Sequence, residues 1–306
     1  MRQNARLSLI AVVVLVVAVS LPWWMSAYVL GLLTLAYYFG VFAMAWDLLF
    51  GFAGEVNFGP TFLIGIGAYT AGILNSRYGL SIPVCVAAGA VAATAGGVAL
   101  ALPALRLHGP YFGLVTLVAV LLLQQMIVIF ASVTGGEIGM TVPDVLSIDD
   151  ATNYWIALGF MAVSGAILFV LSRSALGLIL QASGQDAIAA GALGFNVTKH
   201  KLAAFCISAL FSGLSGALLI FYFGTASVGT VIDIAVGVQI IIACVLGGRR
   251  TILGAAVGAV FLIVAGELLR PLGQLSTFVV SAVALAVILF FPNGLIGTLL
   301  HRDDTL

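Results

Sequence analysis

Three histidines and three cysteines are the side chains in this sequence best suited to bind a metal ion or to act in catalysis. Zinc proteases use an H-E-x-x-H motif and α/β-hydrolases a G-x-S-x-G motif, and neither occurs. The cysteines lie apart in apolar stretches and the histidines in the loops between such stretches: Cys85, Cys206 and Cys244, and His108, His200 and His301. A lone thiol in such a stretch is most simply a small core residue. Catalysis by this chain alone and a metal site are therefore not expected.

A phosphate-binding loop of the form G-x-x-x-x-G-K-[ST] is also absent from the sequence. Such a loop holds the phosphates of ATP through its backbone amides and its lysine. If ATP drives any process here, a different chain must bind it.

The composition of the chain indicates a membrane protein. Of 306 residues, 63% are hydrophobic and only 7% are charged, and the mean hydropathy is +1.25. A soluble domain exposes far more charge, whereas a helix that crosses the hydrocarbon core of a bilayer needs about 20 apolar residues. Runs near that length recur at 7–21, 28–50, 82–102, 111–133, 154–172, 202–223, 234–246, 252–269 and 275–291. We expect an all-α fold, a polytopic helical bundle that forms a single transmembrane domain over 1–306.

One shorter stretch, 60–74, is rich in glycine and could be a re-entrant or a complete span. Counting it as a span gives about ten crossings and places both chain ends on one side of the membrane. Most of the basic residues then lie on the same side of the membrane as the chain termini: Arg2, Arg6, Arg106, Arg173, Lys199, Lys201, Arg249, Arg250 and Arg302. Only Arg77 and Arg270 lie on the opposite side. Because basic residues are retained on the cytoplasmic side, we expect both ends in the cytoplasm. The loop 131–153, which is acidic and has no Lys or Arg, should then be outside.

The first run, 7–21, also resembles a cleavable signal peptide, since arginines precede it. Pro22, Trp23 and Trp24 follow it, and tryptophans at this position are typical of an anchor at the membrane interface. We therefore expect this run to stay in the protein as its first span.

Few ionisable residues lie close to the apolar runs. Ion-driven transporters usually keep several such groups at mid-membrane depth for proton or ion relay. Here Asp47 and Glu55 flank the end of one run, and Glu267 and Arg270 flank the end of another. All four lie near predicted boundaries, where the simpler interpretation is an interfacial or helix-capping position. No proton relay is required.

Glycine-rich stretches around 60–74 are the best indication of a solute path, because broken or closely packed helices line such paths. We expect Glu55, Asn57 and Thr61 to line it, with Glu137 near its outer mouth. Gly254 and Gly258 have G-x-x-x-G spacing and are expected to pack helices together. Plain close packing is also the alternative explanation for the other glycine pairs.

The order of these pieces resembles the inner-membrane permease subunits of branched-chain amino-acid ABC importers, the Liv type. The resemblance covers almost the whole chain and rests on GFAGEVNFGPTFLIGIGAYTAGIL (51–74), RLHGPYFGLVTL (106–117), TGGEIGMTVP (134–143), GALGFNVTKHKLAAFCISALFSGLSGALL (191–219) and CVLGGRRTILGAAVGAVF (244–261). Each stretch alone is a weak signal, but their occurrence in this order is specific. A related sugar-permease branch shares the last stretch.

The resemblance implies an importer made of several chains in the inner membrane of a bacterium. Two cytoplasmic ATPases would bind ATP and Mg²⁺, a second permease would complete the pathway, and a periplasmic or extracellular solute-binding protein would deliver the solute. This chain itself would hold no cofactor, would contact membrane lipid and would bind no nucleic acid. Its solute would be a branched-chain amino acid or a similar small polar molecule, such as an amide, urea or a small carboxylate.

The loop 173–201 would be the cytoplasmic coupling loop that rests on an ATPase. It is the longest loop on the predicted inner face, and it favours a short helix over 186–193 that ends at Gly194 and is followed by Asn196 as a turn residue. Ala189, Ala190 and Gly194 match the alanines and the glycine of the family's coupling motif. The family has acidic residues beside these alanines, where this chain has Ala187, Ile188 and Gly191, and Asp186 could replace one of them.

The residues alone also fit other classes of membrane protein. An ion-coupled secondary transporter would work as a single chain without ATP. A scaffolding protein would show no solute flux. The shared last stretch keeps a sugar-type ABC permease open as well.

Overall fold

The computed structural model describes residues 16–107 and 110–273, together with residues 275, 278, 279, 282 and 285. Helices dominate this part of the chain, and six of them are long and apolar enough to cross a membrane. The prediction of a polytopic helical membrane protein is therefore confirmed. The runs expected at 7–21 and 275–291 lie largely outside the described residues.

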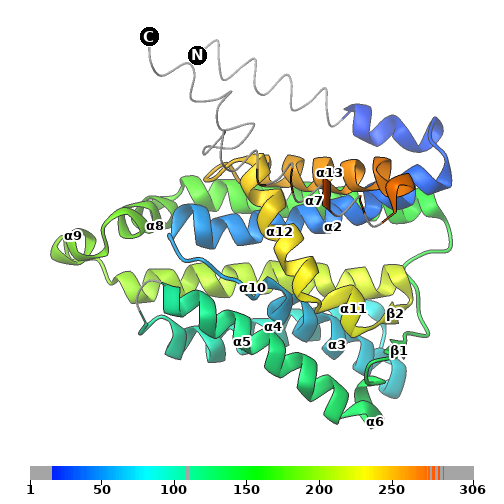
Figure 1. The fold of residues 1–306 in the computed structure, drawn as a ribbon, viewed down its shortest axis with the longest axis horizontal. Coiled ribbons are helices and arrows are strands. Elements are labelled where there is room, and N and C mark those ends of the chain that lie inside the picture. The colour runs from blue at the N-terminus through cyan, green and yellow to red at the C-terminus, as the bar shows by residue number, and fades with distance from the viewer. Residues whose placement is uncertain are drawn as a thin grey trace.

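The long helices form two layers (Figure 1). One layer contains α2 (Ala27–Asp47), α7 (Asp150–Arg173) and α13 (Leu253–Leu268). The other contains α3 (Pro60–Tyr78), α4 (Ile82–Ala104), α5 (Pro110–Ile129) and α10 (Val197–Phe223). The obliquely placed α12 (Ile234–Gly247) packs against α13 and α2 of the first layer and against α3 of the second.

The centre of the molecule is the contact of α2 with α10, one helix from each layer. In each of these helices 72% of the most apolar 18-residue window is buried, compared with 33% in α5 and α7. The outer helix α5 instead exposes large apolar side chains such as Leu122 and Ile129, as expected of a helix that faces lipid.

Glycines let the helices of the second layer approach closely. A Cβ at Gly67 of α3 would collide with the backbone of Gly213 in α10, and a Cβ at Gly89 of α4 would lie 2.6 Å from the carbonyl oxygen of Gly67. Part of the glycine-rich stretch after residue 60 therefore serves helix packing.

The basic residues of the described part sort to the two ends of the bundle. We call one end the basic end; it carries Arg106, Arg173, Lys199, Lys201, Arg249 and Arg250 at helix termini. The helices α8 (Ala175–Gln185) and α9 (Ala187–Ala192) of the predicted coupling loop lie there (Figure 1). The opposite end, called the strand end, carries α6 (Ala131–Thr134), α11 (Val228–Val231) and the antiparallel pair β1 (Met140–Thr141) and β2 (Thr225–Ala226).

Short elements complete the described chain. A π-helical turn, Leu48–Phe52, continues α2, and 3₁₀ turns cover Leu21–Trp23 and Arg270–Leu272.

The segment expected as a short span over 60–74 is longer in the structure. The helix α3 has 19 residues and extends to Tyr78, so it is about 28 Å long at 1.5 Å per residue. The predicted stretch ended at Leu74, but the next residue, Asn75, lies buried within the helix. Its amide nitrogen donates to the carbonyl of Leu80 at 2.9 Å and to the carboxylate of Asp144 at 2.7 Å. One hydrogen-bond partner of the Asn75 amide, Leu80, is close in the sequence, and the other, Asp144, lies in a distant loop.

Candidate functional site

The connecting segment, residues 53–59, leads from the π-helical turn after α2, at the basic end, inward to the start of α3 (Figure 1) and is held by hydrogen bonds throughout. The indole nitrogen of Trp46 donates to the carbonyl of Asn57 at 2.6 Å. The side-chain oxygen of Asn57 accepts from the backbone N–H of Gly59 at 2.8 Å, and the N–H of Phe58 donates to the Thr116 hydroxyl at 3.0 Å. Non-helical backbone inside a membrane protein needs such partners. The segment is therefore a built feature of the fold.

Glu55 of this segment forms an ion pair with Lys201, whose Nζ lies 2.5 Å from its carboxylate. Both side chains are largely buried, with 14% of the lysine and 18% of the glutamate exposed. Lys201 is the last residue of the predicted coupling loop and lies in the first turns of α10. The pair thus joins the connecting segment to the end of that loop.

The coupling loop also touches the connecting segment through two glycines. Gly184 in α8 packs on Gly54, where an added Cβ would lie 3.0 Å from the Cα of Gly184. A Cβ on Gly184 would lie 2.7 Å from the carbonyl oxygen of Phe52. The two backbones are therefore in direct contact, and any side chain at Gly184 would separate them.

The helix α9 is closed at both ends by local interactions. The carboxylate of Asp186 accepts from the N–H groups of Ile188 and Ala189, each at 2.9 Å. Gly194 follows with a φ of +89°, and the bonds from Phe195 N–H to Ala190 O and from Gly194 N–H to Gly191 O form a Schellman end. The sequence predicts this helix one residue longer at each end.

Asn196 then begins α10, and its side chain accepts from the N–H of Lys199 at 3.0 Å. The predicted coupling residues therefore lie together around one turn of the basic end: Asp186, Ala189, Ala190, Gly194 and Asn196. Ala190 is buried, whereas Ile188 and Leu193 beside it are 87% and 75% exposed. This turn presents an apolar surface at the basic end.

Asp47 is a buried charged residue whose partners the sequence did not indicate. Its buried carboxylate accepts from the backbone N–H groups of Arg250 at 3.0 Å and Ile252 at 2.9 Å. Those two residues have φ values of 64° and 44°, which are unusual for residues other than glycine. The guanidinium Nε of Arg250 donates to the carbonyl of Gly51 at 2.8 Å. Asp47 thus fastens the turn between α12 and α13 to the end of α2.

The seam between α2 and α10, which is the contact between these two helices, contains buried polar side chains. Ser208, Ser212, Ser215 and Tyr222 lie on one face of α10, since they are spaced by four, three and seven residues. The Ser215 hydroxyl donates to the carbonyl of Tyr38 at 3.2 Å, and the Tyr222 hydroxyl to that of Gly31 at 3.3 Å. The spacing of these polar residues in the apolar α10 could have revealed the seam from the sequence.

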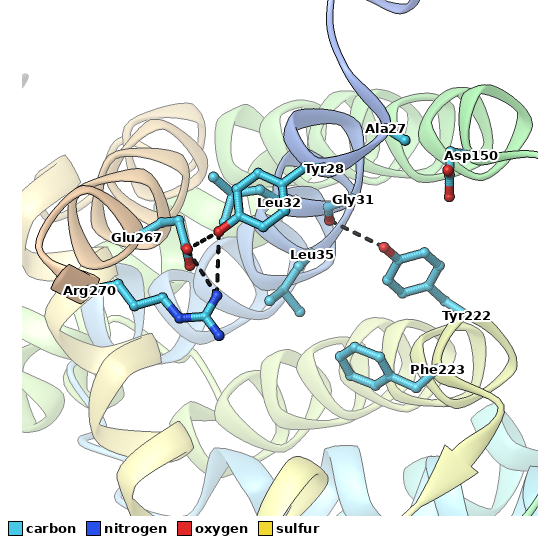
Figure 2. Close-up of a pocket in the computed structure, with 10 residues that line it drawn as sticks. All are labelled: Ala27, Tyr28, Gly31, Leu32, Leu35, Asp150, Tyr222, Phe223, Glu267 and Arg270. Atoms are coloured by element: carbon cyan, nitrogen blue, oxygen red, sulfur yellow. Dashed lines mark hydrogen bonds and ion pairs between the residues drawn. The ribbon is translucent and has the colours of Figure 1, made fainter. Parts of the chain in front are cut away.

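A cavity of about 450 Å³ opens at the strand end of this seam. Figure 2 shows Glu267, Arg270 and Tyr28 on one side of it and Tyr222 and Asp150 on the other. The remaining lining residues are Ala27, Gly31, Leu32, Leu35 and Phe223.

The predicted solute-path residues are only partly brought together. Glu55 and Asn57 belong to the connecting segment, whereas Thr61 lies in the first turn of α3, packed against Gly237 of α12. The buried Thr61 hydroxyl has no hydrogen-bond partner among the described residues. Glu137 is exposed in the turn between α6 and β1 at the strand end, far from the other three.

The predicted packing glycines lie between α12 and α13. A Cβ on Gly258 would collide with the carbonyl of Ala243 and with Gly247, and Gly254 lies against Gly247 as well. The two helices are in backbone contact at these positions.

Comparison with known proteins places these features in a family. Residues 28–292 match the family described as the permease component of the branched-chain amino acid transport system. The chain is 27% identical to the high-affinity branched-chain amino acid transport system permease protein LivM of Salmonella typhimurium LT2, over 92% of this chain and 73% of that protein. It is 28% identical to LivM of Escherichia coli K12, over 94% of this chain and 74% of that protein.

A third relative, the permease protein BraD of Pseudomonas aeruginosa, is 31% identical over 45% of each chain. No solved structure matches the chain. Because the family match spans most of the sequence, including the connecting segment, the coupling loop and the cavity, the chain belongs to the branched-chain amino acid transport system permease family.

Proposed function

We propose that the chain forms one half of the solute pathway of an ATP-driven importer for branched-chain amino acids in the bacterial inner membrane. The observation that carries this proposal is the family match over 28–292, in a chain with six helices able to span a membrane within its described part. The sequence has no phosphate-binding loop, so ATP and Mg²⁺ would be bound by two partner ATPases at the cytoplasmic side. The chain itself is a transport component and performs no catalytic step.

In the proposed topology the whole chain, 1–306, is one transmembrane domain with ten spans and both ends in the cytoplasm. The gathering of Arg106, Arg173 and Lys199 at the basic end supports the cytoplasm for that end. Single cysteines in a variant without native cysteines test this assignment. A cysteine at Glu137 should react with an impermeant reagent in intact cells, and one at Arg106 only after permeabilisation.

In the proposed coupling step the loop 173–201 rests on an ATPase through α9. The exposed side chains Ile188 and Leu193 would enter an apolar groove of that partner. Motion of the loop would reach the connecting segment by two routes, the Gly184–Gly54 backbone contact and the Lys201–Glu55 ion pair. The connecting segment lies between α2 and α3, so both helices would respond.

In the proposed pathway the solute moves along the seam of α2 and α10. An amino acid is a zwitterion and needs polar partners without a tight site, which the serines of α10 and Tyr222 supply. The bonds of Asp47 and Glu55 close the basic end, whereas the cavity opens at the strand end. This arrangement suits a solute that a binding protein delivers from outside, with a second permease completing the path.

Reconstitution tests the proposed function. The chain is placed in liposomes with the second permease and both ATPases, and the binding protein is added outside. Uptake of labelled L-leucine should require both ATP and the binding protein. Uptake by the chain alone, driven by an ion gradient, would instead identify a secondary transporter, and uptake of sugars in place of leucine would identify the sugar-type branch.

A further inference from the structure

The cavity at the strand end lies where four helices from both layers meet, namely the ends of α2, α7, α10 and α13 (Figure 2). Its volume of about 450 Å³ falls within the range of small-molecule sites. The cavity lies at the end of the polar seam and is lined by both charged and apolar side chains. These features set it apart from a purely lipid-facing groove.

The charged side of the cavity is a three-residue network with unused hydrogen-bonding atoms. Oε1 of Glu267 accepts from the hydroxyl of Tyr28 and from Nη1 of Arg270, the latter at 3.0 Å. Nη1 of Arg270 also donates to the Tyr28 hydroxyl at 3.3 Å. These bonds use a single carboxylate oxygen of Glu267 and a single guanidinium nitrogen of Arg270. Within the described residues, Oε2 of Glu267 and Nε and Nη2 of Arg270 make no hydrogen bond.

These unused atoms match the two charged groups of an α-amino acid. A guanidinium has five N–H donors in a planar fork and binds a carboxylate through two of them. A glutamate oxygen accepts from an ammonium group. Because both groups of an amino acid are attached to one carbon, an adjacent arginine and glutamate can bind them together.

The rest of the cavity favours an aliphatic side chain. Leu32 and Leu35 of α2 and Phe223 of α10 line the part between the network and Tyr222. Asp150 lies across the cavity and makes no hydrogen bond or ion pair among the residues described. Its carboxylate would repel a solute with an acidic side chain.

We propose that Glu267 and Arg270 bind the ammonium and carboxylate groups of an aliphatic α-amino acid, whose side chain lies on Leu32 and Leu35. The inference rests on the proposed import function and deepens it by assigning an entry site. The competing explanation is structural: the same network could only tie the end of α13 to α2. Ligands that lack one charged group separate the two explanations.

The experiment uses the complete complex of both permeases and both ATPases in lipid nanodiscs, without the solute-binding protein. Saturation-transfer NMR gives the affinities of L-leucine, of L-leucinamide, which lacks the carboxylate, and of 4-methylpentanoate, which lacks the ammonium group. We expect leucine to bind at least about tenfold more tightly than either analogue, because each loses a charge-assisted contact. Leu35→Trp, which fills the cavity without altering the network, should abolish leucine binding.

Two variants assign the roles of the network. Arg270→Gln should lower the affinity for leucine to that for leucinamide, and Glu267→Gln should lower it to that for 4-methylpentanoate. The matched control is Arg77→Gln, at the same end of the bundle, whose guanidinium donates to the carbonyl of Ser132 outside the cavity. It should leave all three affinities unchanged.

Equal affinities of the wild-type complex for leucine and leucinamide would overturn the proposal. If Arg270→Gln lowered the affinity for all three ligands by the same factor, the proposal would also be overturned. The network would then only hold the end of α13 against α2. The same complex can import leucine in liposomes with its binding protein and still give either of these two results. In that case the proposed entry site is wrong and the proposed import function stands. If the wild-type complex imports no leucine, the proposed function itself fails.

Discussion

Lys201 and Glu55 lie 146 positions apart in the sequence and form a 2.5 Å ion pair that links α10 to the connecting segment. Lys201 is the last residue of the predicted coupling loop, and Glu55 lies in the chain that precedes α3. The pair therefore joins the element proposed to contact an ATPase to the backbone that separates two central helices. The Gly184–Gly54 contact lies on the same segment, so the coupling loop is attached to it at two points.

Loss of the lysine from this pair should weaken coupling between ATP hydrolysis and transport. Lys201→Met leaves the Glu55 carboxylate largely buried without its partner, so we expect a destabilisation of about 1–3 kcal/mol, below the value for a fully buried pair. Leucine uptake per ATP hydrolysed should fall. Lys199→Met is the control, because Lys199 is exposed and has no ion pair in the described chain.

The reversed pair, Glu55→Lys with Lys201→Glu, should recover part of the lost coupling. Equal uptake per ATP in wild type and Lys201→Met would show that the ion pair has no part in coupling.

A bulky residue at Gly194 should block the coupling step without preventing assembly. An added Cβ at this position has open space within 4 Å, so Gly194→Trp leaves the packed interior intact. It places a large side chain beside Leu193 and also strains a residue with φ of +89°, at a cost of about 1–2 kcal/mol. Solute-stimulated ATP hydrolysis by the purified complex should be lost.

Gly159→Trp in α7 is the matched control, since its added side chain also meets open space, but away from the basic end. Unchanged stimulation in Gly194→Trp would remove this turn from the proposed ATPase interface.

A side chain at Gly184 should push α8 away from the connecting segment. The Cβ of Gly184→Val would lie 2.7 Å from the carbonyl oxygen of Phe52, and backbone cannot move aside as a flexible side chain can. Overpacking of this kind costs about 1–3 kcal/mol. Transport should fall with the thermal stability of the complex, measured by its unfolding temperature in detergent.

Gly191→Ala serves as the comparison, because a Cβ there meets nothing within 4 Å and alanine favours a helix. If both variants keep wild-type stability and uptake, the glycine contact is not required.

Replacement of Asp47 should loosen the turn between α12 and α13. Asp47→Asn keeps one oxygen acceptor but loses the charge and the second acceptor, so we expect a destabilisation of about 1.5–3 kcal/mol. The backbone N–H groups of Arg250 and Ile252 are then no longer both satisfied, and their unusual φ values should relax. Hydrogen exchange at these two amides measures the effect directly.

The control for this variant is Glu137→Gln, an exposed acidic residue at the strand end. Protection of the Arg250 and Ile252 amides at the wild-type level in Asp47→Asn would contradict the role assigned to the carboxylate.

The sequence correctly predicted those features that depend on residues close together along the chain. The helix α9, its cap at Asp186, its end at Gly194 and the start of α10 after Asn196 all arise from contacts within about one turn. The apolar runs predicted the long helices for a similar reason, because the length and composition of a span are set by the lipid around it. The same information underestimated α3, which ends at the left-handed Gly79 and in which the side chain of Asn75 also reaches the distant Asp144.

Only the tertiary structure decided which of the few polar residues meet. The sequence placed Asp47, Glu55, Glu267 and Arg270 near helix ends and favoured capping or interfacial roles for them. The fold pairs Glu55 with Lys201 and Asp47 with a turn 203 positions away, and it brings Tyr28 to Glu267 and Arg270. An unpartnered charge in an apolar environment is costly, so the buried Asp47 and the largely buried Glu55 need partners. Which partner each of them meets is decided by helix packing, which local sequence does not encode.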